Sequence, residues 1–442
     1  MVRLEEHKHN SQDKAIEKIP LPAKVYIPLS QHLGKACTPE IKVGDSVFAG
    51  QRIATAEANV YAPVHASIPG KVVAIVDWPH PVLGRAKAIV IEGDGRERTE
   101  DRGQRTEEEI DKLTPEEIRK IILGAGIVGM GGAGFPTHIK LNPPKPVDTL
   151  IINGAECEPY LTADYRLMLE KKEEILSGAE LAARCLGVKN IYLAIEDNKP
   201  EAIKAFNDGI RLPALLAGQA GNTPACRPGR GYGIRILKTE YPQGGEKQLI
   251  KNILGREVPS GKLPFEVGVV VQNVGTAFAI YEAVYRNKPL YERVVTVTGS
   301  CIANPKNLLV PIGTPIKELI DFCAPLKAEP DKIVLGGPMM GIAQYTNLVP
   351  VIKTTTGIIL MDKREARDKE EQSCIRCGAC IRDCPSGLMP CLINLAAEKE
   401  LWPQAKKYCA LDCIECGVCN YVCPANRRLV QSIKRAKLEA VK

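Results

Sequence analysis

The chain has 442 residues, of which 45% are hydrophobic and 25% charged, a composition typical of globular proteins with room for about three or four domains. Its formal net charge is +7, and no stretch interleaves lysine and arginine with aromatic residues, so the sequence does not favour a nucleic-acid-binding function. The first residues lack the apolar segment of a secretory signal, and the longest uncharged stretch, 333–352, is broken by glycine and proline. We therefore expect a cytoplasmic chain without a membrane-spanning helix of its own.

The amino-terminal region is predicted to be a short tail followed by a small β domain. We expect His7 and His9 to lie in a mobile tail. From about Val25 to Asp94, short β-type runs alternate with glycine turns, which predicts a barrel-sandwich. This region is similar to biotinyl- and lipoyl-type domains, but its expected hairpin tip, 57–61, has no lysine. We therefore expect a packing or docking domain rather than a cofactor carrier, followed by a charged linker at 93–109.

A glycine-rich segment, 129–140, follows a helix that we expect to begin at Thr114, where threonine, proline and glutamate form a capping-box pattern. Closely spaced glycines allow the backbone to lie against a flat ring or a phosphate, with N–H groups turned inward. The stretch 124–129 also fits G-x-G-x-x-G, but it follows a helix rather than a strand and lacks the acidic residue expected about 20 residues later. We therefore reject a Rossmann site, and we expect His138 to pack beside the glycine-rich segment.

The next region alternates apolar runs with helical patterns, which predicts a mainly parallel α/β sheet with ligand sites at the carboxyl ends of its strands. The predicted strands are 150–152, 191–195, 234–237 and 269–271, and the predicted helices lie near 163–186, 199–207 and 246–254. A β module with one helix is expected at about 291–362. The basic residues of the last helix, between Arg427 and Lys437, are expected to form a solvated face.

Ten of the sixteen cysteines lie from Cys374 onward, and eight of them form two runs of C-x₂-C-x₂-C-x₃-C-P. This is the spacing of bacterial two-cluster ferredoxins, in which three cysteines of one run and the last cysteine of the other bind the same cluster. We therefore predict two [4Fe–4S] clusters. The first would be bound by Cys374, Cys377, Cys380 and Cys423, and the second by Cys413, Cys416, Cys419 and Cys384.

Structural zinc and disulfides are the alternatives for these cysteines. Zinc ribbons use pairs of C-x₂-C rather than triplets, and a doubled quartet with a proline after each favours clusters. The other cysteines that we considered are expected to be buried core residues. They are Cys157, Cys185, Cys226, Cys301, Cys323, Cys391 and Cys409.

Several segments resemble known proteins in a fixed order. The segments 131–140 and 153–159 resemble the FMN- and NADH-binding segments of the flavoprotein subunit of respiratory complex I, and 241–246 and 272–276 match further segments of it. With a barrel-sandwich before them and the double ferredoxin motif after them, the chain as a whole resembles the C subunit of the Rnf ion-translocating electron transport complexes, from about residue 20 to 430. The stretch 338–344 agrees with the soluble-ligand-binding β-grasp module of that family.

This resemblance implies a multidomain α/β architecture. The implied domains are a lipoyl-like barrel-sandwich with its linker (1–108), an FMN/NADH-binding α/β domain (109–290), a β-grasp domain (291–365) and a helical ferredoxin-like domain with two [4Fe–4S] clusters (366–442).

The resemblance also implies roles for individual residues. Lys140 would contact the phosphates of FMN or the nicotinamide nucleotide, Phe135 would stack on the dinucleotide, and Glu156 would lie beside the flavin. Glu158 and Glu246 would hydrogen-bond the nicotinamide nucleotide. The residues implied to hold FMN are Gly129, Gly131, Gly132, Gly134, Asn153, Gly245, Asn273 and Thr276.

Two residues depart from the complex I pattern. Met130 stands in place of an arginine and Ala155 in place of an aspartate, and each change removes a polar anchor.

The function implied by the resemblance is exchange of hydride with NAD(H) and of single electrons through the clusters, because FMN accepts electrons in pairs and releases them singly. The chain would be a peripheral subunit on the cytoplasmic face of the cell membrane. Its partners would be the membrane subunits of the Rnf complex and its ferredoxin-type subunit, and we find no separate acid–base or nucleophilic catalytic residue.

Two other functions remain open from the sequence. One is a soluble flavin and iron–sulfur reductase of a corrinoid cofactor, which co-purification with membrane subunits would distinguish. The other is a ferredoxin-like relay without flavin, favoured by Met130 and Ala155 and tested by flavin absorbance.

Overall fold

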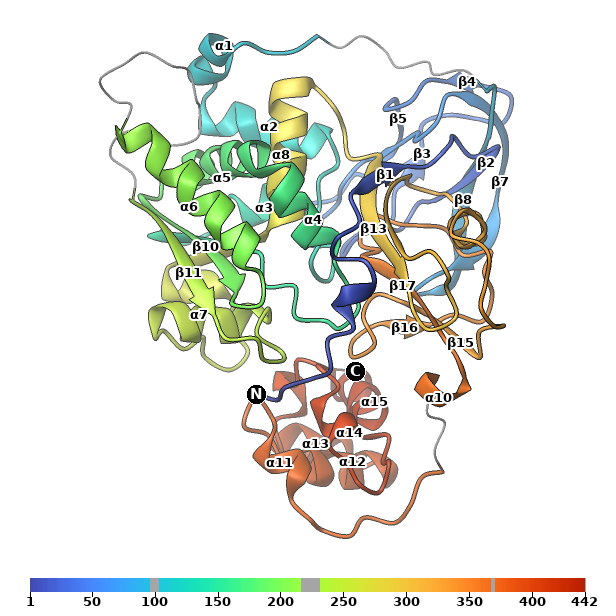
Figure 1. Cartoon of the computed structure of the whole chain (residues 1–442), viewed down its shortest axis with the longest axis vertical. Coiled ribbons are helices and arrows are strands. Elements are labelled where there is room, and N and C mark those ends of the chain that lie inside the picture. Colours follow the sequence, from blue (N-terminus) through green and yellow to red (C-terminus); the bar gives the residue numbers. More distant parts are fainter. Residues whose placement is uncertain (96–102, 216–230, 367–369, 442) are drawn as a thin grey trace.

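The computed structural model describes residues 1–95, 103–215, 231–366 and 370–441, and Figure 1 shows how they are arranged. The amino-terminal β domain consists of two sheets, ordered β2-β8-β7-β4 and β3-β5-β6. Its strands are β2 (Lys24–Pro28), β3 (Thr38–Pro39), β4 (Ser46–Val47), β5 (Arg52–Thr55), β6 (Val64–His65), β7 (Gly70–His80) and β8 (Gly84–Gly93). Val25, Ile53 and Ile89, from three of these strands, are fully buried in one core, which confirms the predicted β domain.

The second group of elements surrounds a parallel sheet ordered β11-β10-β9-β12. Its strands are β9 (Thr149–Asn153), β10 (Asn190–Glu196), β11 (Gly231–Leu237) and β12 (Val269–Asn273), and they contain the four predicted strands. Leu150 and Ile152 of β9 face one apolar core, whereas Ile151 between them faces another. Helices therefore cover both faces of this sheet, as a parallel sheet requires.

The helices of this group are α1 (Glu107–Lys112), α2 (Pro115–Gly124), α3 (Thr137–Lys140), α4 (Ala163–Glu170), α5 (Lys172–Leu186), α6 (Pro200–Leu215), α7 (Glu246–Leu254) and α8 (Val274–Arg286), with a 3₁₀ turn at Pro264–Val267. The capping box predicted at Thr114 is present, because its hydroxyl accepts from Glu117 N–H and its own N–H donates to the Glu117 carboxylate. Thr106 and Glu109 form a second capping box, so α1 begins inside the stretch predicted to be a linker.

The third group forms a six-stranded sheet ordered β1-β14-β13-β17-β15-β16. Its elements are β1 (Ile16–Lys18), β13 (Glu292–Thr298), β14 (Lys306–Pro311), α9 (Ile316–Phe322), β15 (Lys332–Leu335), β16 (Ile342–Ala343), β17 (Gly357–Met361) and α10 (Lys363–Ala366). Strand β1 pairs in parallel with β14. The first strand of the chain therefore belongs to a sheet whose other strands begin after residue 290.

The amino-terminal segment 1–18 crosses from one domain to another rather than forming a mobile tail. It contains a 3₁₀ turn at Lys8–Asn10, and Lys8 is only 7% exposed. The His7 ring stacks on the Tyr160 ring with 4.5 Å between centroids, and Val2 pairs with Tyr241. The expectation for His7 and His9 was therefore wrong, because carbonyl groups far along the chain bind the ammonium group of Lys8 and hold this segment in place.

The carboxy-terminal domain is helical and lies at the bottom of Figure 1. Its helices are α11 (Ala379–Arg382), α12 (Pro390–Glu398), α13 (Trp402–Lys407), α14 (Val418–Tyr421) and α15 (Leu429–Val441), with a 3₁₀ turn at Ala410–Asp412. Ile393, Ala397 and Ile433 are fully buried or nearly so in its core. Among the helices of the described residues, none has the length and apolar character needed to cross a bilayer.

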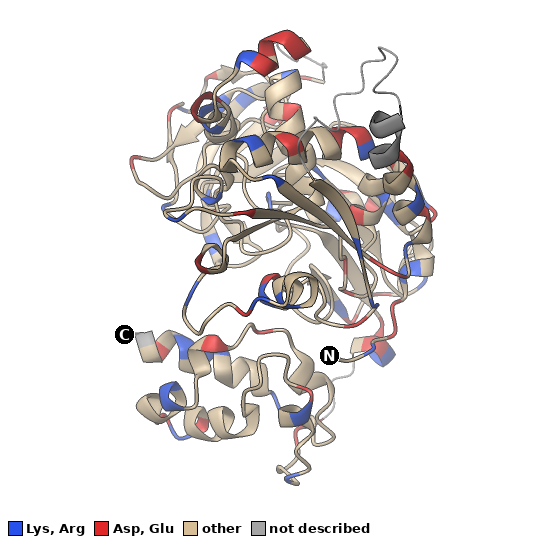
Figure 2. Cartoon of the chain, turned by 90° about the vertical axis from the view of Figure 1, so that its left-hand side faces the viewer, with Lys and Arg blue, Asp and Glu red and all other residues tan. Residues whose placement is uncertain are grey.

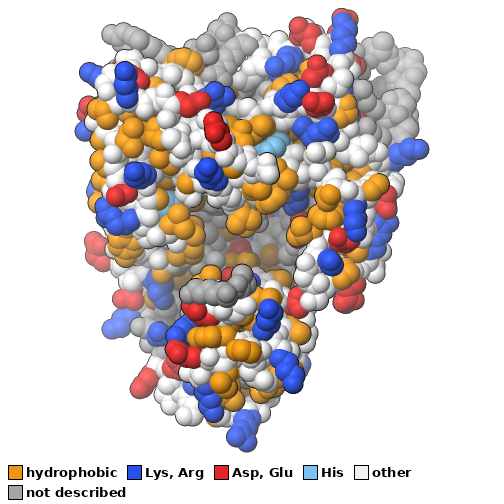
Figure 3. Space-filling view, turned by 180° about the vertical axis from the view of Figure 1, so that it is seen from behind, with side chains coloured by type: hydrophobic (Ala, Val, Ile, Leu, Met, Phe, Trp, Pro, Cys, Tyr) orange, Lys and Arg blue, Asp and Glu red, His pale blue; other side chains and the backbone are white. Residues whose placement is uncertain are grey.

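Residues of both charges are spread along the chain in Figure 2, and their side chains are interspersed on the face shown in Figure 3. In α15, Arg435 and Lys437 each form an ion pair of 2.5 Å, with Glu400 and Glu415 respectively. The basic residues of the last helix are thus largely paired with acidic residues of the same domain, in keeping with the predicted solvated face.

Candidate functional site

The glycine-rich segment forms a loop between α2 and α3 that is closed at its base by a bridge between Val128 and Pro136. A Cβ atom added at Gly131 would lie 2.9 Å from the side-chain nitrogen of Asn273, so the loop lies directly against the end of β12. At Gly132 an added Cβ would meet no atom within 4 Å. No contact with the rest of the chain therefore requires glycine at this position, and the space beside it is open to a ligand.

Two asparagines lie beside this loop at the carboxyl ends of neighbouring strands. Asn153 ends β9 and Asn273 ends β12, and the two residues are register partners. Asn153 donates to Gly244 O over 2.9 Å, and Asn273 donates to Asp164 over 2.6 Å. The loop is held to the same edge because Met130 N–H donates to the Thr276 hydroxyl over 3.0 Å. The structure thus brings together the glycine loop and the two strand ends that the sequence assigned to one site.

The two departures from the complex I pattern are buried apolar residues in this structure. Met130 is 6% exposed and belongs to the core beneath α5 and α8, and Ala155 is 9% exposed in the core on the other face of the sheet. His138, in the short helix α3 that follows the glycine loop, lies edge-on to Tyr61 of the amino-terminal β domain with 6.4 Å between ring centroids. Burial lowers the pKa of His138 to about 4.

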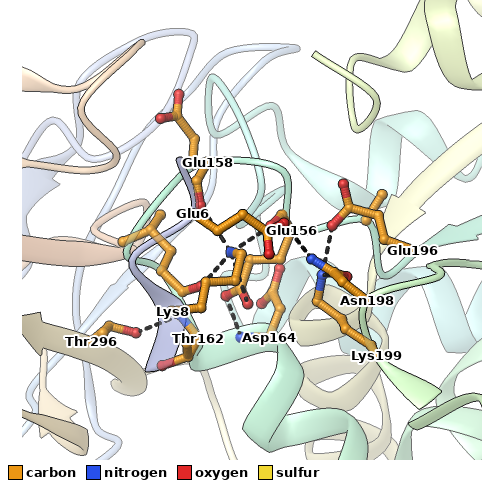
Figure 4. Close-up of polar contacts among 12 residues, drawn as sticks. Glu6, Lys8, Glu156, Glu158, Thr162, Asp164, Glu196, Asn198, Lys199 and Thr296 are labelled. Atoms are coloured by element: carbon orange, nitrogen blue, oxygen red, sulfur yellow. Dashed lines mark hydrogen bonds and ion pairs between the residues drawn. The ribbon is translucent and has the colours of Figure 1, made fainter. Parts of the chain in front are cut away.

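Glu156 is a buried carboxylate at the centre of a charged group drawn in Figure 4. Its Oε1 atom accepts from Asp164 N–H over 2.9 Å, whereas its Oε2 atom has no hydrogen-bond partner and lies 4.0 Å from Lys8 Nζ. Burial raises the pKa of Glu156 to about 7, against the opposing effect of Lys8. A buried oxygen without a partner is a group that a bound ligand or water molecule would satisfy.

The four residues that the resemblance assigns to the nicotinamide nucleotide or its phosphates do not form one cluster. Lys140 and Glu246 form a partly exposed ion pair of 2.6 Å. Glu158 instead accepts hydrogen bonds from the backbone N–H groups of Met339 and Met340, over 3.1 and 2.9 Å. Its carboxylate therefore joins the domain of the parallel sheet to the loop after β15. Phe135 is half-buried at the end of the glycine loop, where its carbonyl accepts from Gly129 N–H.

The two cysteine motifs have matching backbone conformations. In each motif the residue before the second cysteine, Arg376 or Glu415, has a left-handed φ, of 56° and 58°. The glycine after that cysteine, Gly378 or Gly417, is also left-handed, and a short helix, α11 or α14, begins directly after it. A left-handed φ is costly for a residue other than glycine, so its occurrence at the same place in both motifs indicates one repeated loop structure.

The structure brings together the four cysteines that were assigned to the second cluster. Cys384 of the first motif lines one cavity with Cys413, Cys416 and Cys419 of the second. In the other direction, Cys380 has Cys423 as an electrostatic neighbour, and burial raises the pKa of the Cys380 thiol to about 11. Within the part of the chain that the structure describes, no three His, Cys, Asp or Glu side chains converge on a position for a single metal ion.

The remaining cysteines follow the predictions in part. Cys185, Cys301 and Cys323 are buried, as is Cys37, which the sequence analysis did not single out; Cys157 and Cys391 are half-buried, and Cys226 lies outside the described residues. Cys409 was expected in the core but is exposed, because it precedes the turn at Ala410–Asp412 in a left-handed conformation. Cys391 lies beside the predicted cluster ligand Cys380.

The sequence analysis missed three residues of this site. They are Lys8, which contacts the loop after β9; Asp164, which accepts from Asn273; and Tyr241, whose hydroxyl donates to the carbonyl of Cys416. Only Tyr241 lay in a segment that the sequence analysis had singled out.

Together, the fold and these sites define a multidomain α/β protein in which the parallel-sheet domain, called the flavin-type domain below, lies beside a cysteine-rich helical domain. Residues 122–282 match the Nuo51 FMN-binding domain, residues 2–96 the RnfC barrel sandwich hybrid domain, and residues 294–343 the SLBB domain. The chain belongs to the RnfC family, the C subunits of the ion-translocating Rnf ferredoxin:NAD(+) oxidoreductase complexes, which confirms the predicted family and its oxidoreductase class.

Two relatives illustrate this similarity. The C subunit of the proton-translocating ferredoxin:NAD(+) oxidoreductase complex of Clostridium ljungdahlii is 47% identical over 441 residues, which cover 99% of this chain and 93% of the relative. The C subunit of the Na(+)-translocating ferredoxin:NAD(+) oxidoreductase complex of Acetobacterium woodii is 44% identical over 422 residues, which cover 95% and 91% of the two chains.

A solved structure is similar in fold. It is the NAD+-reducing [NiFe]-hydrogenase in its H2-reduced state, with a TM-score of 0.52 and 19% identity, covering 75% of this chain and 66% of that chain.

Proposed function

We propose that this chain is a peripheral subunit of a membrane-bound ferredoxin:NAD+ oxidoreductase coupled to ion translocation. It would exchange hydride with NAD(H) at an FMN and pass single electrons through two [4Fe–4S] clusters. Membership of the RnfC family and the match to an FMN-binding domain support the general role. The observation that carries the cluster assignment is the cavity shared by Cys384, Cys413, Cys416 and Cys419.

The residues present fit a flavin at the edge of the parallel sheet. The glycine loop is open beside Gly132, Asn153 and Asn273 lie side by side at the strand ends, and Glu156 has a buried oxygen without a partner. Bound there, FMN would exchange hydride as an electron pair and deliver single electrons. The chain's own groups would hold the ring, and Lys140 with Glu246 would orient the phosphates and the nucleotide. The residues proposed for this site are Gly129, Gly131, Gly132, Gly134, Phe135, Lys140, Asn153, Glu156, Glu158, Gly245, Glu246, Asn273 and Thr276.

The two proposed cluster sites differ in their surroundings. Cys416 and Cys419 are buried, and Cys416 shares an apolar cluster with Tyr241 of the flavin-type domain. Cys374 and Cys377 are exposed. The site formed with Cys384 is therefore proposed to be nearer the flavin. The site of Cys374, Cys377, Cys380 and Cys423 would face a partner, which we infer to be the ferredoxin-type subunit of the complex or one of its membrane subunits.

The predicted domain boundaries, 1–108, 109–290, 291–365 and 366–442, and the position on the cytoplasmic face of the membrane are also part of this proposal. The two relatives are named for different ions, so similarity to them does not identify the coupling ion. The match of residues 2–96 to the barrel-sandwich named for RnfC favours this function over a corrinoid reductase.

Anaerobic reconstitution of the full chain tests the proposal. We expect about eight irons per chain, from two [4Fe–4S] clusters, together with one noncovalent FMN whose absorbance is bleached by NADH. A reconstituted chain that binds iron but no flavin would be a ferredoxin-like relay, and a flavin-loaded chain that NADH does not reduce would contradict the enzymatic part of the proposal.

A further inference from the structure

The amino-terminal segment is tied to the loop that follows β9 at several points. The Glu6 carbonyl accepts from Tyr160 N–H over 2.7 Å, and the His7 ring stacks on the Tyr160 ring. The Ser11 hydroxyl lies 2.8 Å from the hydroxyl of Thr162. These contacts join residues more than a hundred positions apart, so the segment is a fixed part of this site.

Lys8 is the centre of this attachment. Its ammonium group donates to the carbonyl oxygens of Glu156, Glu158 and Leu161, over 2.7, 2.9 and 2.6 Å. These three bonds use all three N–H groups of the ammonium. Because they converge on one short loop, they fix its path, and Figure 4 shows Lys8 beside that loop with Glu156 and Asp164 next to it.

The same ammonium group is also a charge facing the unpartnered oxygen of Glu156, 4.0 Å away. Lys8 and Glu156 are 7% and 8% exposed, so water screens their interaction poorly. We propose that Lys8 is a positioning residue of the flavin site, which holds the loop 156–161 by its backbone and sets the charge of Glu156. This inference rests on the proposed function, in which Glu156 lies beside the flavin.

Other charged groups act on the same carboxylate. Burial and Asp164 raise the pKa of Glu156, whereas Lys8 and Lys199 lower it. Without Lys8, the pKa of Glu156 would rise further, and the carboxylate would ionise only at higher pH. The charged groups that face this pair from the surrounding elements are Glu6 of the amino-terminal segment, Glu158 of the loop after β9, Asp164 of α4, Glu196 and Lys199 at the end of β10, and Arg293 of β13, which acts through Asp164.

The test compares Lys8→Met with Lys14→Met, a matched control in which the same change is made at an exposed lysine of the same segment. Each full-length variant is reconstituted anaerobically, and the pH dependence of flavin reduction by NADH is measured. We expect the pH profile of Lys8→Met to move to higher pH and that of Lys14→Met to stay in place. In a Glu156→Gln background, adding Lys8→Met should produce no such move.

A second measurement needs no flavin. Hydrogen exchange of the peptide that contains the Tyr160 amide should accelerate in Lys8→Met by about tenfold or more. Loss of hydrogen bonds to a charged group shifts the local opening equilibrium by about that factor. Lys8→Arg, which keeps the charge, should restore the pH profile. If Lys8→Met does not retain its iron, Lys8→Gln takes its place, because it keeps donor groups without the charge.

An unchanged pH profile together with unchanged exchange in a folded variant would overturn the inference. A wild-type chain whose flavin NADH fails to reduce would instead overturn the proposed function. In that case the exchange experiment alone decides whether Lys8 holds the loop.

Discussion

The hydroxyl of Tyr241 donates a hydrogen bond of 2.8 Å to the carbonyl oxygen of Cys416, from the flavin-type domain to the cysteine-rich domain. The same hydroxyl lies 3.2 Å from the carboxylate of Glu158. Tyr241 is 2% exposed, and Val418 and the half-buried Cys157 pack in the same cluster. This contact fixes the second cysteine motif against the domain that is proposed to bind flavin.

Removing this hydroxyl should loosen the contact between the two domains. Tyr241→Phe leaves a buried carbonyl and a buried carboxylate with one partner fewer, which we expect to cost about 1–3 kcal/mol. The thermal midpoint should fall, and electron transfer from NADH to the clusters should slow more than flavin reduction does. Tyr345→Phe is the control, because Tyr345 also donates to a carbonyl, that of Gly84, but is 66% exposed. Equal effects of the two changes would contradict this role of Tyr241.

The proposed crossed assignment of the cysteines makes a prediction about iron content. Cys384→Ser should remove the cluster whose other ligands are Cys413, Cys416 and Cys419, leaving about four irons per chain in the other cluster. Electron paramagnetic resonance of the reduced protein should then show one signal without magnetic coupling to a neighbour. Cys409→Ser, at an exposed cysteine outside both motifs, should keep all of the iron. Loss of the Cys374-containing cluster in Cys384→Ser would contradict the crossed assignment.

Local patterns in the sequence predicted much of this structure. The strand runs of the parallel sheet, the capping box at Thr114 and the repeated cysteine loops all depend on neighbouring residues, and all are present. The proximity of the glycine loop to Asn273 also followed, because the carboxyl ends of parallel strands share one edge.

Contacts between distant segments were not predictable in the same way. Nothing near Lys8 indicates that it would be buried, since its three acceptors lie about 150 positions later in the chain. The pairing of β1 with β14 and the bonds from Met339 and Met340 to Glu158 are of the same kind. Met130 was treated as a lost polar anchor, and only the packing of α5 and α8 shows that its side chain belongs to the core.

The contrast between Gly131 and Gly132 allows a test of the flavin site. In Gly131→Ala the new Cβ would lie 2.9 to 3.1 Å from the side chain of Asn273, so Asn273 or the loop must shift, at a cost of about 1–3 kcal/mol in stability. In Gly132→Ala the new Cβ meets no protein atom within 4 Å. We therefore expect only Gly131→Ala to lower the thermal midpoint of the flavin-free chain, and both changes to weaken FMN binding in a fluorescence titration. If Gly132→Ala bound FMN as tightly as the wild-type chain does, the flavin would not lie beside Gly132, and the proposed site would be contradicted.

Lys353 joins three domains through one buried ammonium group. It lies in the segment before β17 and donates to Pro63 O of the barrel-sandwich and to Gly126 O of the flavin-type domain, each over 2.7 Å. The side chain is 1% exposed, and burial lowers the pKa of Lys353 from its ordinary value to about 7. The folded chain therefore loses this proton near pH 7, whereas the unfolded chain keeps it up to about pH 10.

This difference predicts how stability changes with pH. Between about pH 7 and pH 10 the unfolded state binds more protons at Lys353 than the folded state does. The contribution of Lys353 to the free energy of unfolding therefore rises with pH in this range, by up to about 1.4 kcal/mol per pH unit. This contribution is lost as pH falls through 7. Thermal midpoints measured anaerobically at pH 7, 8 and 9 should therefore rise less steeply, or fall more steeply, in Lys353→Met than in wild type. Lys71→Met, at an exposed lysine of β7, should follow the wild-type slope. Identical slopes in all three chains would show that the ammonium group of Lys353 keeps its proton in the fold and that its carbonyl bonds outweigh the effect of burial.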